Sequence, residues 1–115
     1  MSTQFKKCYN RKIETTRQHL LYKCWDVLYN YIPTIENCIL KSNRDKNFDW
    51  KIYLQEIDTN IKQICKSHNI LENQKPYNYL SSHINHARKM NTSREIVNNL
   101  QLLINVITAN YNRRV

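Results

Sequence analysis

Glycine is absent from this chain of 115 residues, and its only prolines are Pro33 and Pro76. Glycine adopts left-handed backbone conformations at little steric cost, and phosphate-cradling loops, dinucleotide-binding turns and tight hairpins depend on it. The Walker and Rossmann nucleotide-binding motifs are therefore excluded. We also find no pair of β-strand patterns and no internal repeat, so helices are the expected elements.

Apolar residues recur at helical spacing from Phe5 to Tyr31, which predicts a long first helix. Proline suits the first turn of a helix, so we expect Pro33 to end this helix or to open a short second one through Ile39. A third helix is predicted from a cap at Asp49 to about Asn69, because its apolar residues again follow a period near 3.6.

A fourth helix is predicted after Pro76 and should end at about Asn91, because asparagine tolerates the left-handed conformation. Thr92 and Glu95 then have the spacing of a capping box. The fifth helix that follows should bury Ile96, Leu100, Leu103, Ile104 and Ile107. We therefore predict one all-α domain, residues 1–115, with about five helices. An up-and-down bundle is the default arrangement, and an orthogonal array is the alternative.

The charge of the chain is strongly basic, with 18 Lys and Arg against 9 Asp and Glu, for a net charge of +9. Residues 1–23 and 73–115 each carry a net +5, whereas residues 24–72 carry −1. The 16 Asn and 13 Ile are typical of coding from an AT-rich genome, which also inflates Lys. Codon bias is therefore the alternative to a functional role for the charge.

Segregated basic charge with interleaved tyrosines suits a polyanion, and our leading hypothesis is a regulatory or accessory protein that binds nucleic acid, DNA or RNA. On the first helix, Lys7, Arg11, Gln18, Tyr22 and Tyr29 should lie opposite the apolar face. The residues expected to contact phosphates are Lys6, Lys7, Arg11, Arg88, Lys89, Arg94, Arg113 and Arg114. Base contacts are expected from Arg94, Asn98 and Asn99.

Residues 80–102 invite comparison with a helix-turn-helix motif. The residues that would supply its small, turn and docking positions are Ala87, Asn91, Val97 and Leu100. His86 departs from that motif, because it occupies a position that should be apolar, and the usual turn glycine is missing. A plain helical hairpin is the alternative.

A helical protein-interaction module is the second hypothesis. Such an inhibitor, immunity factor or adaptor would engage an acidic protein partner through helix faces that carry tyrosine and arginine. Tight binding to that partner, with only weak and salt-sensitive binding to nucleic acid, would distinguish it.

Zinc binding and catalysis are further alternatives. Cys65, His68, His83 and His86 form two pairs of zinc-ligand types on adjacent predicted helices, but the pattern is weak. A cluster of Tyr77, His83, His86, Arg88 and Lys89 has acid–base groups without a paired carboxylate or nucleophile. We expect no enzyme activity, no metal and no cofactor.

The first residues show no signal-peptide pattern, and no apolar run reaches the ~18 residues that a membrane span needs. We therefore expect an intracellular protein, cytoplasmic or nuclear. In a reducing compartment Cys8, Cys24, Cys38 and Cys65 should be free thiols.

Overall fold

The computed structural model describes the backbone of residues 2–113 and the side chains of residues 16–113. Four helices make up this part of the chain: α1 (Ser2–Arg44), α2 (Trp50–Ser67), α3 (Tyr77–Arg88) and α4 (Ser93–Arg113). The predicted all-α class is confirmed, and the number of helices is four where about five were predicted.

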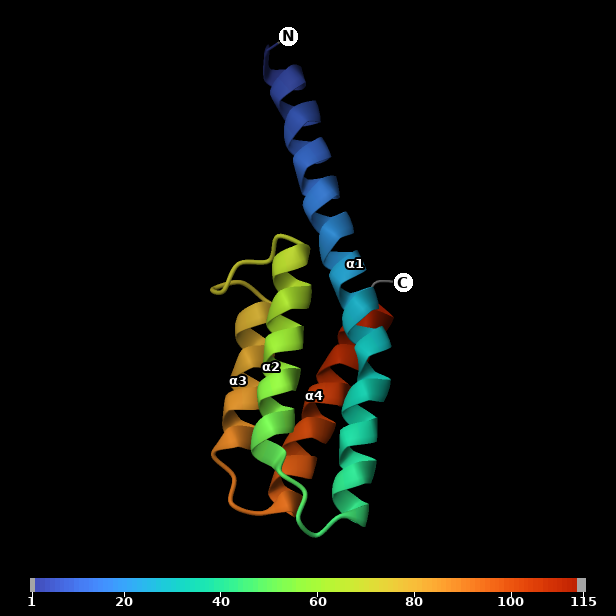
Figure 1. Ribbon diagram of the computed structural model, residues 1–115. Helices are drawn as coiled ribbons and strands as arrows, with labels where there is room; N and C mark the ends of the chain where they lie inside the picture. The colour runs from blue at the N-terminus through green and yellow to red at the C-terminus, as the bar shows by residue number, and fades with distance from the viewer. Residues whose placement is uncertain (1, 114–115) are drawn as a thin grey trace.

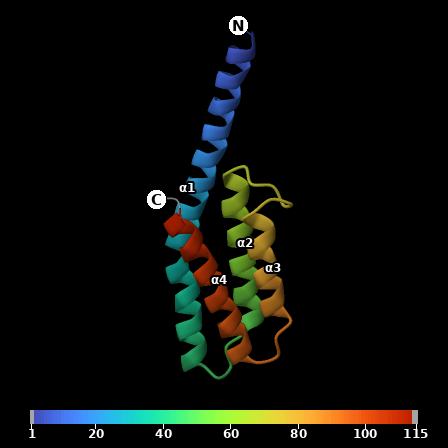
Figure 2. The same cartoon turned by 180° about the vertical axis from the view of Figure 1, so that it is seen from behind.

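The helices form an up-and-down bundle, in which each helix runs opposite to the one before it (Figure 1). Each also packs against two neighbours, in the pairs α1–α2, α2–α3, α3–α4 and α1–α4. The view from behind shows α4 returning beside α1, which closes the ring of four (Figure 2). The predicted default arrangement is thus the one observed, and the orthogonal array is not.

The difference in helix number arises at Pro33, which lies inside α1. The predicted break there is wrong. On both sides of the proline, α1 buries one continuous apolar stripe, which consists of Cys24, Leu28, Ile32, Ile35 and Ile39. Proline in a helix interior costs about 3 kcal/mol, whereas burial of one large aliphatic side chain contributes about 1.5–3 kcal/mol. The packed side chains therefore outweigh the lost backbone hydrogen bond.

The core follows the predicted apolar spacing in the other three helices, except that Ile104 of α4 is only half-buried. Leu80, Ile84 and Ala87 of α3 are fully buried. The buried residues of α2 and α4 are Trp50, Leu54, Ile57, Ile61, Cys65, Ile96, Leu100, Leu103 and Ile107. In α1, Leu28 is fully buried, whereas its neighbour Val27 is 40% exposed.

The helix ends agree with two of the predicted caps. Asp49 accepts a hydrogen bond from the amide of Lys51, and the Thr92 hydroxyl accepts one from the amide of Glu95. The predicted left-handed stop at Asn91 is wrong, because α3 already ends at Arg88 with right-handed backbone at Lys89. Within residues 2–113 the non-glycine residue with positive φ is Asn69, at 60°, just after α2.

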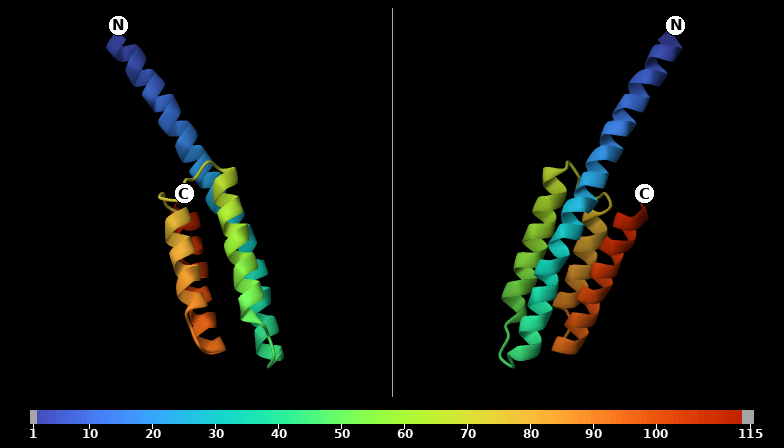
Figure 3. Two further views of the ribbon diagram at one scale, coloured as in Figure 1. Left: turned by 60° about the vertical axis from the view of Figure 1, so that its left-hand side comes forward. Right: turned by 90° about the vertical axis from the view of Figure 1, so that its right-hand side faces the viewer.

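The first half of α1 projects beyond the other three helices in every view (Figure 3). The molecule accordingly measures 68 Å along its long axis but only 25 × 18 Å across. Residues 16–19 are exposed, and the first buried side chain in the described part of α1 is Cys24. Across residues 2–113, none of the helices has the length and apolar character required to cross a membrane.

Candidate nucleic-acid interface

The basic residues predicted to bind nucleic acid lie at two opposite ends of the bundle. Arg113 is the last residue of α4, at the end from which α1 projects (Figure 1). Arg88, Lys89 and Arg94 lie at the other end, where α3 leads into α4. The fold therefore does not gather the predicted residues on one surface.

Four of the predicted residues fall outside the described side chains. Lys6, Lys7 and Arg11 belong to the projecting part of α1, of which only the backbone is described. Arg114 lies beyond the described residues altogether.

Arg88 takes part in a contact within the bundle. Its guanidinium Nη2 lies 3.2 Å from Asp58 Oδ2 and donates a hydrogen bond to Gln55 Oε1 at 2.6 Å. Lys62 Nζ approaches the same Asp58 oxygen at 3.0 Å. Asp58 is only 3% exposed, so these contacts offset the cost of burying its charge. Arg88 thus joins α3 to α2 and is not a freely available phosphate ligand.

The helices of the helix-turn-helix comparison, α3 and α4, lie side by side and run in opposite directions (Figures 1 and 3). This is the arrangement of a helical hairpin, whereas a helix-turn-helix sets its two helices at about 90–120°. Of the residues expected to contact bases, Arg94 and Asn98 are exposed. Asn99 instead donates its amide to the backbone oxygen of Glu95 at 2.9 Å.

The end of the bundle from which α1 projects brings together three cations that are far apart in the sequence. One hollow, with a volume of about 570 Å³, lies between α1 and the loop after α2, and Arg17 and Lys75 both line it. A second hollow, of about 280 Å³, lies between that loop and α4, and Lys75 and Arg113 line it. The described residues that line the two hollows include no Asp or Glu. We call Arg17, Lys75 and Arg113 the basic end.

An exposed aromatic ring lies within the basic end. Tyr79 is 44% exposed and lines the second hollow, and Lys75 Nζ lies 5.8 Å from the centroid of its ring. His83 packs edge-on against the same ring at 5.0 Å. Burial, and secondarily the charge of His86, lower the pKa of His83 below its usual value, so the imidazole is neutral at pH 7. The ammonium group of Lys75 can bind a phosphate, and the ring of Tyr79 can stack on a base or sugar.

The tyrosines predicted for the solvent face of α1 both have partners. The Tyr22 hydroxyl accepts a hydrogen bond from Gln18 at 2.6 Å. Tyr29 stacks on Tyr111 of α4, with ring centroids 4.0 Å apart. These rings therefore stabilise the helix and the α1–α4 contact, and Tyr79 is the better placed aromatic for a ligand.

The fold disperses the residues of the zinc alternative. Cys65 is fully buried and lies beside Cys24, while His86 is exposed on α3. Within residues 16–113, no three His, Cys, Asp or Glu side chains gather in a geometry that could hold a metal ion. The acid–base cluster is split as well, since Tyr77, His86 and Lys89 line one groove, whereas His83 packs on Tyr79.

The three described cysteines are free thiols and are buried. The hydrogen bond with Cys65, together with burial, raises the pKa of Cys24, so this thiol stays protonated at neutral pH. Burial is also the main cause of the raised pKa of Cys38. Such thiols pack as small apolar groups. The side chain of Cys8 lies outside the described residues.

Sequence reasoning missed Lys75 and Tyr79. Both belong to the basic C-terminal part of the chain, but their distances in sequence from Arg17 and Arg113 conceal that they lie together. The pattern of short linkers predicts that successive helices alternate in direction. With five helices this alternation would place the chain ends at opposite ends of the bundle. Both chain ends instead lie at one end of the bundle because α1 continues through Pro33, which leaves four helices in the described part of the chain.

No protein-family model matches this chain, and comparisons with curated proteins and with solved structures give no significant match. The function is therefore argued from the residues of the chain itself.

Proposed function

We propose that this protein binds nucleic acid through the basic end and the projecting part of α1. One observation carries the proposal: Lys75 lies between Arg17 and Arg113, in two adjoining hollows whose described lining contains no carboxylate. Each phosphate that such a cation neutralises releases condensed counterions, which favours binding at low salt.

The projecting helix supports the same assignment. An α-helix with its side chains is about 10–12 Å in diameter, and the major groove of B-form DNA is about 12 Å wide. The first half of α1 stands clear of the bundle, so the bundle would not obstruct its approach to a duplex (Figure 3). Its sequence supplies Lys6, Lys7, Arg11 and Lys12 against the single acid Glu14.

An acidic protein partner is the second candidate, and a different observation favours it. Leu71 is 60% exposed in the larger hollow, beside the half-buried Leu20, Leu21 and Ile70. An apolar surface of this kind, flanked by Arg17 and Lys75, suits a protein helix with both acidic and apolar residues. A phosphate backbone would leave these leucines without a partner.

A binding titration with matched variants tests the proposal. Purified protein is titrated into labelled duplex DNA, single-stranded DNA and an RNA hairpin, and fluorescence anisotropy is followed at ~50 mM and ~200 mM salt. The triple variant Arg17→Gln, Lys75→Gln, Arg113→Gln removes the basic end. The control Arg44→Gln, Lys46→Gln, Arg94→Gln removes the same charge, two Arg and one Lys, at the opposite end.

We expect the affinity of the basic-end variant for the preferred polymer to fall by a factor of about ten or more. The affinity of the control variant should fall by less than about threefold. Equal losses in the two variants would mean that net charge alone drives binding, and the proposed interface would be wrong. Loss of all binding at ~200 mM salt would favour the protein partner instead.

A further inference from the structure

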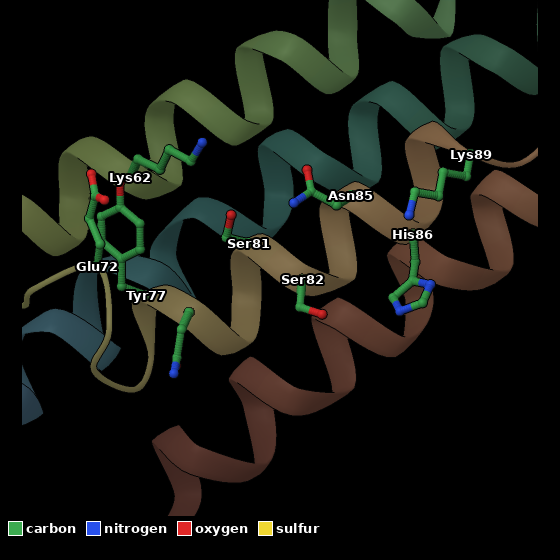
Figure 4. A pocket seen from close by; sticks show the side chains of 9 residues that line it. Lys62, Glu72, Tyr77, Ser81, Ser82, Asn85, His86 and Lys89 are labelled. Atoms are coloured by element: carbon green, nitrogen blue, oxygen red, sulfur yellow. The ribbon is translucent and has the colours of Figure 1, made fainter.

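A separate polar groove runs between α2 and α3, and its lining includes none of the three residues of the basic end. It has a volume of about 490 Å³, within the range of small-molecule sites, and Figure 4 shows the side chains along it. Lys62 enters it from α2, Ser81 and Asn85 from α3, and Lys89 from the position directly after α3. Because Lys89 keeps a right-handed helical backbone, the spacing of four residues places Ser81, Asn85 and Lys89 on one face.

The two ammonium groups of the groove approach the same stretch of α3. In Figure 4, Lys62 extends from α2 and Lys89 from the end of α3, both toward the segment that carries Asn85. No carboxylate among residues 16–113 forms an ion pair with Lys89. Its positive charge is therefore available to an anion in the groove.

Lys62 has fewer contacts within the bundle than Arg88. Its ammonium group approaches Asp58 alone, whereas the guanidinium of Arg88 contacts both Asp58 and Gln55. An ammonium group has three N–H donors, so Lys62 keeps donors for an anion. Lys62 and Arg88 both contact the single oxygen Oδ2 of Asp58, at 3.0 and 3.2 Å. Two cations thus share one carboxylate, and the group of three keeps a net charge of +1. The surplus charge lies on Lys62 and Arg88, whose side chains are each about one-third exposed, so salt screens it in part.

The remaining lining of the groove suits a polar ligand with hydroxyl groups. Ser81, Asn85 and His86 offer hydrogen-bond donors and acceptors, and Glu72 provides an acceptor at the end of the groove away from Lys89 (Figure 4). Two rings belong to the described lining. Tyr77 is only 5% exposed, so the exposed imidazole of His86 is the ring that a nucleobase could reach. The groove therefore offers polar contacts along most of its length and one small ring for stacking.

We propose that this groove binds a small phosphorylated polyol, with the phosphate between Lys62 and Lys89 and the hydroxyl groups along Ser81, Asn85 and Glu72. This site is independent of the proposed nucleic-acid interface. Its ligand would be held by directional hydrogen bonds and two charges, a combination that a simple phosphate ion uses only in part.

The test is a titration of isotopically labelled protein with ribose 5-phosphate, ribose or inorganic phosphate at constant ionic strength, followed by two-dimensional NMR of the backbone amides. We expect ribose 5-phosphate to shift the amides of residues 81–89 and that of Lys62. Ribose and inorganic phosphate should each bind at least about fivefold more weakly, because each lacks part of the contacts.

Variants of Lys62 and Lys89 locate the site. Lys62→Gln and Lys89→Gln should each weaken ribose 5-phosphate binding about fivefold or more. The control Lys66→Gln removes the same charge one turn further along α2, at an exposed residue outside the groove, and should leave the affinity within twofold. The dispersion of the NMR spectrum shows whether each variant is folded.

Three results would overturn the proposal. The first is equal affinity for inorganic phosphate and ribose 5-phosphate, which would leave the polyol contacts without a role. The second is an equal effect of Lys66→Gln and Lys89→Gln. The third is an equal loss of duplex DNA and ribose 5-phosphate binding in Lys62→Gln and Lys89→Gln, because the groove would then hold a nucleic-acid backbone. This last result would not decide whether the basic end binds nucleic acid, because the variants of Arg17, Lys75 and Arg113 test that proposal separately.

Discussion

The buried carboxylate of Asp58 on α2 lies 3.2 Å from the guanidinium of Arg88 on α3. It is the only charged residue in the core of the described part of the chain. Asp58 Oδ1 finds no hydrogen-bond partner among the described side chains, so the stability of the group depends on the two cations at Oδ2. The α2–α3 contact therefore combines apolar packing with one specific polar link.

Replacement of Asp58 by Asn should destabilise the fold. Asp58→Asn removes the carboxylate that both cations contact, and the free energy of unfolding should fall by about 2–4 kcal/mol. Lys62→Met should lower the free energy of unfolding by at most about 1 kcal/mol. The Lys62 side chain is about one-third exposed, and the variant keeps the contact between Arg88 and Asp58. Urea denaturation measures both values, and equal effects of the two variants would contradict this account.

Replacement of Pro33 by Ala should stabilise the protein. Pro33 is exposed, and alanine restores the amide that a helix interior needs without disturbing the buried stripe of α1. We expect an increase of about 1–3 kcal/mol in the free energy of unfolding. Thermal unfolding followed by circular dichroism measures this change in stability. A lower melting temperature in Pro33→Ala would show that the proline has a required local geometry.

The stability of the fold should decrease in mild acid because of His83. Its pKa is lower in the folded protein than the ordinary 6.5, mainly because the side chain is partly buried. The unfolded chain therefore binds more protons, and stability rises with pH in this window. The contribution is complete above about pH 6.5 and is lost as the pH falls through the lower folded pKa.

The variant His83→Gln isolates this effect. The free energy of unfolding is measured by urea denaturation at several pH values between ~7.5 and ~5, the window around the ordinary histidine pKa. The variant should show a shallower dependence on pH than the original chain. Identical slopes would assign the acid sensitivity to other groups.

The sequence was sufficient to predict much of the fold, because apolar period and caps are local signals. The buried positions of Leu80, Ile84 and Ala87 and the cap at Thr92 follow from spacing alone. Pro33 misled the prediction, since its local preference is outweighed by burial that only the assembled bundle provides.

The candidate site was harder to predict, because it depends on which helices become neighbours. Lys75 lines hollows with Arg17 and Arg113 only because the fold places the loop after α2 at the end of the bundle from which α1 projects. Arg88 appeared to be a phosphate ligand in the sequence, but its charge faces Asp58 across the α2–α3 contact. Neither relationship is encoded in sequence spacing.

The salt dependence of duplex DNA affinity tests the central proposal most directly. The slope of log affinity against log salt reports the number of phosphates neutralised, at about 0.9 per contact for B-form DNA. We expect a slope that is shallower by about 2–3 in the triple variant Arg17→Gln, Lys75→Gln, Arg113→Gln, and an unchanged slope in the control Arg44→Gln, Lys46→Gln, Arg94→Gln. Equal slopes for the original chain and the basic-end variant would contradict the proposal.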